Sequence, residues 1–353
     1  MEVILLACVV LSLVKAQECP GEVRAPCTCF PTIYEPVSIV CDGPASLAQA
    51  LTSIGPADGV LIDSLVLANV PITRLPAYAF QGYHIKRLVL RRNRLQAIDP
   101  LAFDGSVGST LQELEIRDNA LGQIPATGLP ALRNLQSLVL AKNGITYIGP
   151  SAFESYLSRQ SLRKLDLSAN RISSIDDNAF AGLVSLQEIG LDKNFLSAIP
   201  SVALARVPSL EGLSLGVNKL KEVGVGALLL PKLRSLSLEV NRIGNLSAEA
   251  LQGVPNLLYL YLSDNKFTRL PGALFRFVRQ LKVLAIGNNP IGDLSGETFT
   301  YVPGLVRVEA SECGLRNLAP GTFQTLPDLQ VLVLNKNKLK RHLPIYQLLQ
   351  PAN

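Results

Sequence analysis

The sequence predicts an α/β solenoid in the shape of a horseshoe, with a parallel β-sheet along its concave side and irregular segments along its convex side. An eleven-residue phrase, clearest as LRKLDLSANRI at 162–172, recurs in steps of 23 to 27 residues from Ile62 onward. Apolar residues occupy positions 1, 4, 6 and 11 of the phrase, and asparagine usually occupies position 9. One such unit is too small to bury a core of its own, so each unit must stack on its neighbours.

The solenoid is predicted to hold about twelve repeats within residues 62–342. The phrases begin at Ile62, Ile85, Leu111, Leu135, Leu162, Leu186, Leu210, Leu233, Leu257, Leu281, Leu305 and Leu329. Because successive strand residues alternate between faces, positions 4 and 6 should point into the core. Positions 3, 5 and 7 should then point out of the concave sheet, where a ligand can reach them.

Phenylalanine or leucine recurs at position 19, and this column is predicted to be a packed spine beneath the convex surface. Its members are Phe80, Phe103, Leu129, Phe153, Phe180, Leu204, Leu228, Leu251, Phe275, Phe299 and Phe323. Two repeats carry insertions, around Gly105–Thr110 and Ser155–Ser161. We expect these insertions to bulge on the convex side or at an edge of the sheet.

The first sixteen residues are predicted to be a secretory signal peptide. Val3 to Val14 is an apolar run too short to span a bilayer, which disfavours an uncleaved anchor. Small residues follow at positions suited to cleavage after Ala16, so Gln17 is the expected mature start. Glu2 departs from the usual pattern, because signal peptides normally begin with a basic residue.

Four cysteines follow the predicted signal, at Cys19, Cys27, Cys29 and Cys41. An even and dense set of cysteines in a secreted chain predicts a disulfide framework. Zinc is the alternative, but no histidine lies nearby and the spacing lacks paired C-x2-C knuckles.

The repeat length, the position-9 asparagine and the preceding cysteines together resemble the "typical" extracellular leucine-rich-repeat proteins. Such cysteine-capped repeats are found in slit, the small leucine-rich proteoglycans and Toll-type ectodomains. The resemblance implies that residues 17–61 form an N-terminal cap over the open end of the repeat stack. It also implies that Cys19 pairs with Cys29 and that Cys27 pairs with Cys41.

The C-terminal tail, residues 343–353, departs from the family, because no second cysteine cap follows Asn337. Three explanations stay open: the tail folds over the last repeat, a partner covers that repeat, or the chain is truncated. No transmembrane run or lipid-anchor tail is found, so a secreted protein is expected. Cys313 occupies position 9 of the eleventh repeat, where we expect a buried thiol; an intermolecular disulfide is the alternative.

The predicted ligand-binding residues lie on the concave face. Tyr259 and Tyr261, beside Val283, form the preferred hot spot, because tyrosine offers a large contact area with little side-chain entropy to lose. The other concave candidates are Glu239, Arg307, Glu309, Arg87 and Arg91. The alternative for the two tyrosines is cross-strand packing on a sheet that simply stays hydrated.

Two basic clusters are candidates for sulfated glycosaminoglycan, with solvated surface charge as the alternative. The clusters consist of Arg87, Arg91, Arg92, Arg94, Lys336, Lys338, Lys340 and Arg341. The net charge of +5 does not indicate nucleic acid as the main partner. Asn245 begins the one N-x-S/T sequon, so it is the candidate glycosylation site.

No set of residues predicts catalysis, a cofactor or a metal site. The two histidines, His84 and His342, lie far apart in the repeat order, and no nucleophile has a histidine near it. The sequence therefore predicts a secreted, non-catalytic protein that binds a protein ligand in matrix assembly, adhesion or ligand sequestration. A truncated receptor ectodomain is the first alternative, and a non-catalytic subunit of a secreted enzyme or carrier complex is the second. The oligomeric state stays open.

Overall fold

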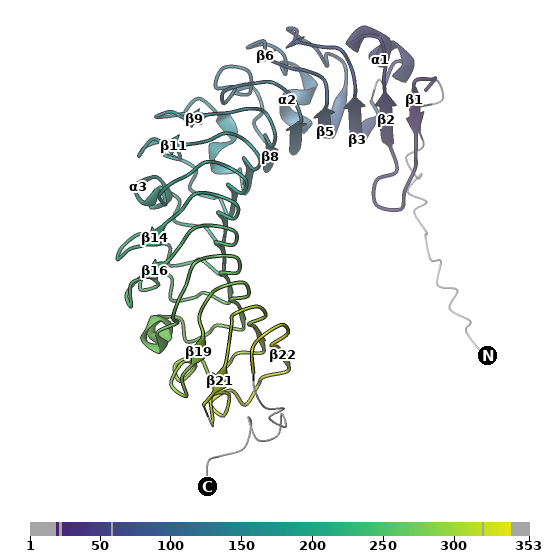
Figure 1. Ribbon diagram of the computed structural model, residues 1–353. Coiled ribbons are helices and arrows are strands. Elements are labelled where there is room, and N and C mark those ends of the chain that lie inside the picture. Colours follow the sequence, from purple (N-terminus) through teal and green to yellow (C-terminus); the bar gives the residue numbers. More distant parts are fainter. Residues whose placement is uncertain (1–18, 21–22, 58, 320, 340–353) are drawn as a thin grey trace, which may run out of the picture.

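The computed structural model describes residues 19–20, 23–57, 59–319 and 321–339 of the 353-residue chain. These residues wind into a curved solenoid whose long sheet follows the inner side of the arc (Figure 1). The sheet has fourteen strands, of which the first two precede the repeats and the other twelve come one from each predicted phrase. The horseshoe fold is therefore confirmed. The predicted signal peptide, residues 1–16, and the tail, residues 343–353, lie outside the described residues.

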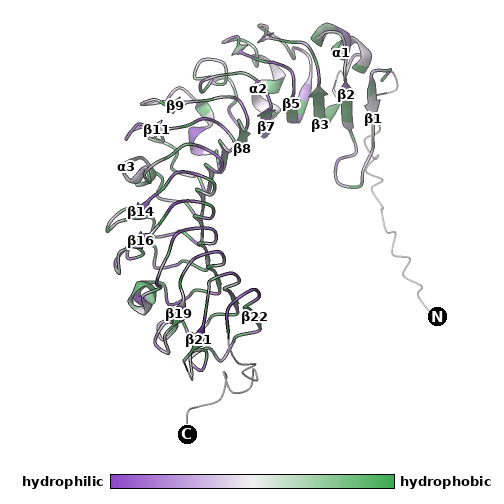
Figure 2. Ribbon diagram, viewed as in Figure 1, coloured by the Kyte–Doolittle hydropathy of each residue, from purple (hydrophilic) through white to green (hydrophobic). Residues whose placement is uncertain are grey.

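The repeat strands pair in parallel and in register, so that equivalent residues of successive phrases lie side by side; Leu138, Leu165 and Ile189 are one such row. In order along the sheet, the strands are β3 (Leu61–Ala68), β5 (His84–Arg91), β7 (Glu113–Arg117), β8 (Ser137–Val139), β10 (Lys164–Asp166), β12 (Glu188–Gly190), β13 (Gly212–Ser214), β15 (Ser235–Ser237), β17 (Tyr259–Tyr261), β18 (Val283–Ala285), β20 (Arg307–Glu309) and β22 (Val331–Val333). Figure 2 shows apolar residues recurring in the turns of the solenoid, interleaved with polar ones.

The N-terminal cap extends the sheet by two strands. Strand β1 (Cys27–Cys29) pairs antiparallel with β2 (Ser38–Asp42), and β2 pairs in parallel with β3. Disulfides join Cys19 to Cys29 and Cys27 to Cys41, so the pairing implied by the family resemblance is confirmed.

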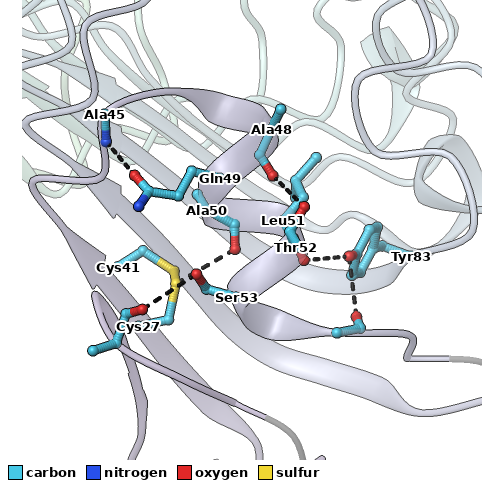
Figure 3. Close-up of a disulfide and its surroundings, with 12 residues drawn as sticks. Cys27, Cys41, Ala45, Ala48, Gln49, Ala50, Leu51, Thr52, Ser53 and Tyr83 are labelled. Carbon is cyan, nitrogen blue, oxygen red and sulfur yellow. Dashed lines mark hydrogen bonds between the residues drawn. A yellow bond between two sulfur atoms is a disulfide. The ribbon is translucent and has the colours of Figure 1, made fainter.

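Helix α1 (Leu47–Ile54) covers the buried side of the cap. Ser46 caps its first turn, because the Ser46 hydroxyl accepts the Gln49 N–H at 3.1 Å. The Cys27–Cys41 disulfide lies against the helix, where Figure 3 shows Ala50 on the face nearest to it. The helix therefore closes the end of the repeat stack with apolar side chains instead of leaving that end exposed to water.

The convex side consists of short, irregular elements that return the chain from one strand to the next. Some are two-residue parallel pairs, which join β4 (Arg74–Leu75) to β6 (Ala97–Ile98), β9 (Tyr147–Ile148) to β11 (Ser174–Ile175), β14 (Glu222–Val223) to β16 (Asn245–Leu246) and β19 (Asp293–Leu294) to β21 (Asn317–Leu318). The others are single turns of helix, α3 (Ser201–Leu204) and the 3-10 turn η2 (Gly272–Phe277).

Both predicted insertions form helical turns just before the next strand. Helix α2 (Ser106–Thr110) fills the first, and the Thr110 hydroxyl bonds the backbone of Ile85 at the start of β5. The 3-10 turn η1 (Leu157–Gln160) fills the second, where the buried Tyr156 ring meets Phe153 edge-on with ring centroids 5.4 Å apart. The extra residues are thus absorbed at the strand-entry edge without interrupting the sheet.

The position-19 column is buried throughout, as predicted. Three pairs of phenylalanines in adjacent repeats stack, with centroid distances of 5.9 Å for Phe80–Phe103, 6.3 Å for Phe153–Phe180 and 5.5 Å for Phe299–Phe323. This spine fixes the spacing of the repeats on the convex side, as the strand hydrogen bonds fix it on the concave side.

Asparagine at position 9 links each repeat to the one before it. The Asn194 amide nitrogen donates to the Leu167 carbonyl of the preceding repeat at 3.0 Å, and its side-chain oxygen accepts the Ile172 N–H at 3.0 Å. The same cross-repeat amide donation is made by Asn93, Asn119, Asn143, Asn170, Asn218, Asn241, Asn265, Asn289 and Asn337. These amides satisfy backbone groups that are buried where each strand ends.

Cys313 takes the place of asparagine in the eleventh repeat. Its thiol lies 3.2 Å from the Ile286 carbonyl, the position that the asparagine amide occupies elsewhere. The Ile291 N–H, which follows Pro290, bonds the Asn289 carbonyl at 2.8 Å, as the Ile72 N–H, which follows Pro71, bonds the Val70 carbonyl. Cys313 is fully buried and unpaired among the described residues, which confirms the predicted buried thiol.

Replacing Asn194 with alanine should lower the free energy of unfolding by about 2–4 kcal/mol, because it leaves buried carbonyl and N–H groups without partners. Asn178, which is exposed on the convex side, is the matched control: Asn178→Ala should change stability by less than about 0.5 kcal/mol. Urea titration followed by circular dichroism measures both. Equal stability of the two variants would refute the role given to the position-9 amides.

Candidate functional site

A trough of 550 Å³ lies on the concave face, across the central strands β10 to β17. Its floor is formed by backbone and small side chains at positions 3 and 5 of the sixth to eighth repeats. These residues are Gly190, Gly212, Ser214, Ser235 and Ser237. Side chains there are too short to cover the sheet, so the hollow follows directly from the sequence of these three repeats.

Ion pairs border the trough on the strand-entry side. Lys164 pairs with Glu188 at 3.5 Å, and Arg234 pairs with Glu211 at 3.6 Å. All four side chains are well exposed, so the pairs add little to stability and can be exchanged for contacts with a ligand.

A second hollow, of 390 Å³, adjoins the trough where the strands end; we call it the exit hollow. It shares Ser168, Asp192 and Ser237 with the trough, so the two form one continuous depression. Its other lining residues are Gly216, Val217, Glu239 and Val240, the basic Arg117, Lys142 and Lys193, and the alanines Ala141 and Ala169.

The acidic residues between the two hollows are held in different ways. Asp192 accepts hydrogen bonds from the Ser214 hydroxyl and, at 3.2 Å, from the Gly216 N–H. Glu239 is half-buried, and this burial, together with the nearby charges of Asp264 and Glu309, raises the pKa of its carboxyl. The folded protein therefore stabilises the ionised form of Glu239 less than water does.

The predicted hot spot lies at the C-terminal end of the trough. Tyr259 is 40% exposed and lines the trough, while Tyr261 is half-buried, which raises the pKa of its phenol. Strand register sets Val283 beside Tyr259 and places Arg307 next in the same row. The structure therefore brings the two tyrosines and Val283 together.

The remaining concave candidates fall into two places. Glu309 is paired with Arg307 at 2.5 Å, so this part of the surface is charged but internally neutralised. Arg87 and Arg91 lie on β5, seven strands from β17 or about 34 Å along the sheet. They do not belong to the tyrosine site.

Arg87 is already engaged, because its guanidinium lies 3.5 Å from Glu113 and 3.9 Å from Glu115. Lys336 likewise pairs with Glu312 at 2.8 Å. These contacts reduce the free positive charge of both basic clusters. Lys340 and Arg341 lie outside the described residues.

Asn245, the predicted glycosylation site, lies in β16 on the convex side and is exposed. A glycan there would not cover the concave face. Glycosylation of Asn245 stays a prediction.

Sequence reasoning did not select the glycines and serines of the trough floor or the exit hollow as site residues. The sequence signal that could have identified them is that positions 3 and 5 of the sixth to eighth repeats carry only glycine or serine, apart from Glu188. In the described part of the chain, no cluster of histidine, cysteine or carboxylate residues could hold a metal ion. None of the described helices is long and apolar enough to cross a bilayer.

Comparison with known families finds leucine-rich repeats over most of the solenoid. The family described as "Leucine rich repeat" matches residues 160–220 and 231–291. The family described as "BspA type Leucine rich repeat region (6 copies)" matches residues 61–160.

Among curated proteins, the chain is similar to lumican of Gallus gallus, with 34% identity over 60% of this chain and 58% of lumican. It is also similar to podocan of Mus musculus, with 30% identity over 56% of this chain and 35% of podocan. The chain thus spans less than two thirds of the length of either relative.

Among solved structures, the chain resembles that of the TLR13–ssRNA13 complex. The TM-score is 0.71 at 25% sequence identity, and the match covers 84% of this chain and 44% of the other.

Replacing Glu239 with glutamine should raise the melting temperature near neutral pH. The folded state raises the pKa of this carboxyl above its unfolded value, so its ionisation favours unfolding as the pH rises through that interval. The gain should vanish near about pH 3, where the carboxyl is protonated in both states. Calorimetry at both pH values tests this, and a gain of equal size at both would contradict it.

Proposed function

We propose that this chain, a member of the extracellular leucine-rich-repeat family, is a secreted and non-catalytic protein that binds a protein ligand on its concave face. The observation that carries the proposal is the continuous depression that ends at Tyr259. Matrix assembly, adhesion and ligand sequestration are the roles that such binding would serve.

The chemistry of the depression suits a protein surface. An aromatic residue stands at one end of a floor of glycine and serine, and ion pairs stand at the border. Protein interfaces combine a few aromatic anchors with a polar rim in this way. The backbone of the floor is rigid because every strand is hydrogen-bonded on both sides, so little order has to be gained on binding.

The TLR13 relative was solved with single-stranded RNA, but the central concave face of this chain disfavours phosphate. In the trough, the carboxylates of Asp166, Glu188, Asp192 and Glu211 outnumber the two cations, Lys164 and Arg234. In the exit hollow, Arg117 and Lys142 are neutralised by Glu115 and Asp118, which leaves Lys193 beside Asp192 and Glu239. Such a surface repels a polyanion. We therefore assign the concave face to protein and not to nucleic acid.

The absence of catalysis is part of the proposal. The concave carboxylates lie on an open sheet with no histidine among the residues that line either hollow. Secretion is supported by the two disulfides of the cap, because such bonds form and persist in oxidising compartments.

Truncating both tyrosines to alanine should weaken ligand binding by about tenfold or more, because aromatic anchors dominate interface energies. The ligand is first captured from extracellular fluid with the wild-type protein, and its affinity for the purified variants is then measured by titration calorimetry. Tyr301→Ala combined with Tyr147→Ala is the matched control, since Tyr301 is 39% exposed and both lie on the convex side. Unchanged affinity for the Tyr259/Tyr261 variant would discard the hot spot.

Filling the floor of the trough should also block binding. A Cβ at Gly212 would meet Glu188 Cγ at an ordinary 3.6 Å, so the Cβ of Gly212→Val clashes with nothing and the added side chain occupies part of the hollow. We expect stability within about 1 kcal/mol of wild type, since valine favours strands, and a loss of affinity for the same ligand. Gly224→Val, in the same repeat on the convex side, is the control with open space around it. Full affinity of the Gly212 variant would place the ligand elsewhere.

A further inference from the structure

Position 8 of all twelve repeats has a left-handed backbone, with φ between 52° and 57°. Most repeats place a charged residue, an asparagine or an alanine there. Val217 and Val240 are the exceptions, at φ 52° and 53°. A β-branched residue at positive φ is a marked outlier, because its branched side chain crowds the backbone in this conformation.

The two valines are neighbours in adjacent repeats and both face solvent. Val217 is 41% exposed and Val240 is 46% exposed. The Val217 N–H donates to the Glu239 carbonyl at 2.8 Å, so Val217 lies directly beside the residue that precedes Val240. Both valines line the exit hollow.

Folding does not account for this choice of residue. The backbone hydrogen bonds of position 8 are made equally by Lys193 and Asp264, so they do not need valine. Neither valine belongs to the hydrophobic core. Backbone strain that is not offset by burial is a feature of functional surfaces.

Glu239 has no basic partner, although three cations line other parts of the exit hollow. Arg117 and Lys142 are paired with Glu115 and Asp118, so Lys193 is the one cation of the hollow without a salt bridge among the described residues. Glu239 lines the same hollow, and no lysine or arginine of the described part of the chain lies within salt-bridge distance of it. Asp264 and Glu309 add negative charge around it, and burial and these charges raise the pKa of Glu239.

We propose that the exit hollow binds a protein segment that carries an aliphatic side chain next to a lysine or arginine. The aliphatic group packs on Val217 and Val240, and the basic group pairs with Glu239. This assignment rests on the proposed function and adds to it the chemistry of the partner. A basic side chain would relieve the repulsion around Glu239, and an aliphatic one would remove the two exposed valines from water.

The first test measures whether the two valines stabilise or destabilise the fold. Asparagine adopts the left-handed conformation readily and already occupies position 8 at Asn288. The double variant V217N/V240N should therefore melt about 1–4 °C above wild type. Val225→Asn is the control, because Val225 is 66% exposed on the convex side of the seventh repeat and is not left-handed. A double variant that melts below wild type would show that the valines stabilise the fold, and this would overturn the inference.

The second test uses a displayed library of random peptides as the probe. Peptides selected on the wild-type protein should be enriched in an aliphatic residue adjacent to lysine or arginine. Synthetic copies should bind V217N/V240N and E239Q about tenfold or more weakly, and V225N as tightly as wild type. Exchange of the basic residue for glutamate in the peptide should abolish binding.

The outcomes separate this inference from the proposed function. If the selected peptides depend on Tyr259 but bind V217N/V240N and E239Q as tightly as wild type, the concave face binds protein and the exit-hollow assignment is wrong. If no selected peptide depends on any concave residue, including Tyr259 and Gly212, the proposed function itself fails. Enrichment of acidic peptides would also overturn the assignment.

Discussion

Everything in this structure depends on how the backbone leaves each strand. A chain that ends a strand inside a packed stack leaves carbonyl and N–H groups that can reach neither a sheet partner nor water. Here a left-handed residue at position 8 turns the chain, and the amide of position 9 then bridges two repeats, as Asn194 does between Leu167 and Ile172. The left-handed residue recurs in all twelve repeats and the asparagine in ten of them, so successive turns leave their strands in nearly the same way and stack in register.

That solution leaves the concave side chains free. Core contacts come from positions 4 and 6, from position 11 and from the position-19 column, so positions 3, 5 and 7 carry no packing duty. The residue type at these positions can therefore vary without altering the backbone, from Arg87, which pairs with Glu113, to Gly212, which has no side chain and forms part of the trough floor. Two residues that are unfavourable in their local surroundings lie along one depression. They are Val217, a β-branched residue with a left-handed backbone, and Glu239, whose carboxyl is half-buried. Features that cost stability thus lie where a partner is expected, which is a common relation between stability and function.

The cap solves a different problem, since a solenoid has an open end. Helix α1 and the Cys27–Cys41 disulfide close that end with apolar side chains. The Tyr83 hydroxyl, at the end of the first repeat, ties the helix to the repeats by donating to the Leu51 carbonyl at 3.0 Å (Figure 3). The antiparallel β1 also occupies the sheet edge that β2 would otherwise expose. The cap therefore supplies both packing and hydrogen bonds to the first repeats.

The sequence by itself determined the repeat length, the strand positions, the buried spine and the burial of Cys313, because each follows from the phase of residues along one repeat. The disulfide pairing came from the resemblance carried by the same cysteines. Only the tertiary structure decided what neighbouring repeats do together. It showed that Arg87 is neutralised by Glu113, that Gly190, Gly212 and Ser214 merge into one trough, and that Val217 meets Glu239 across a repeat boundary. Each of these relations crosses from one repeat to another, and it depends on side-chain size and strand register, which no single repeat contains.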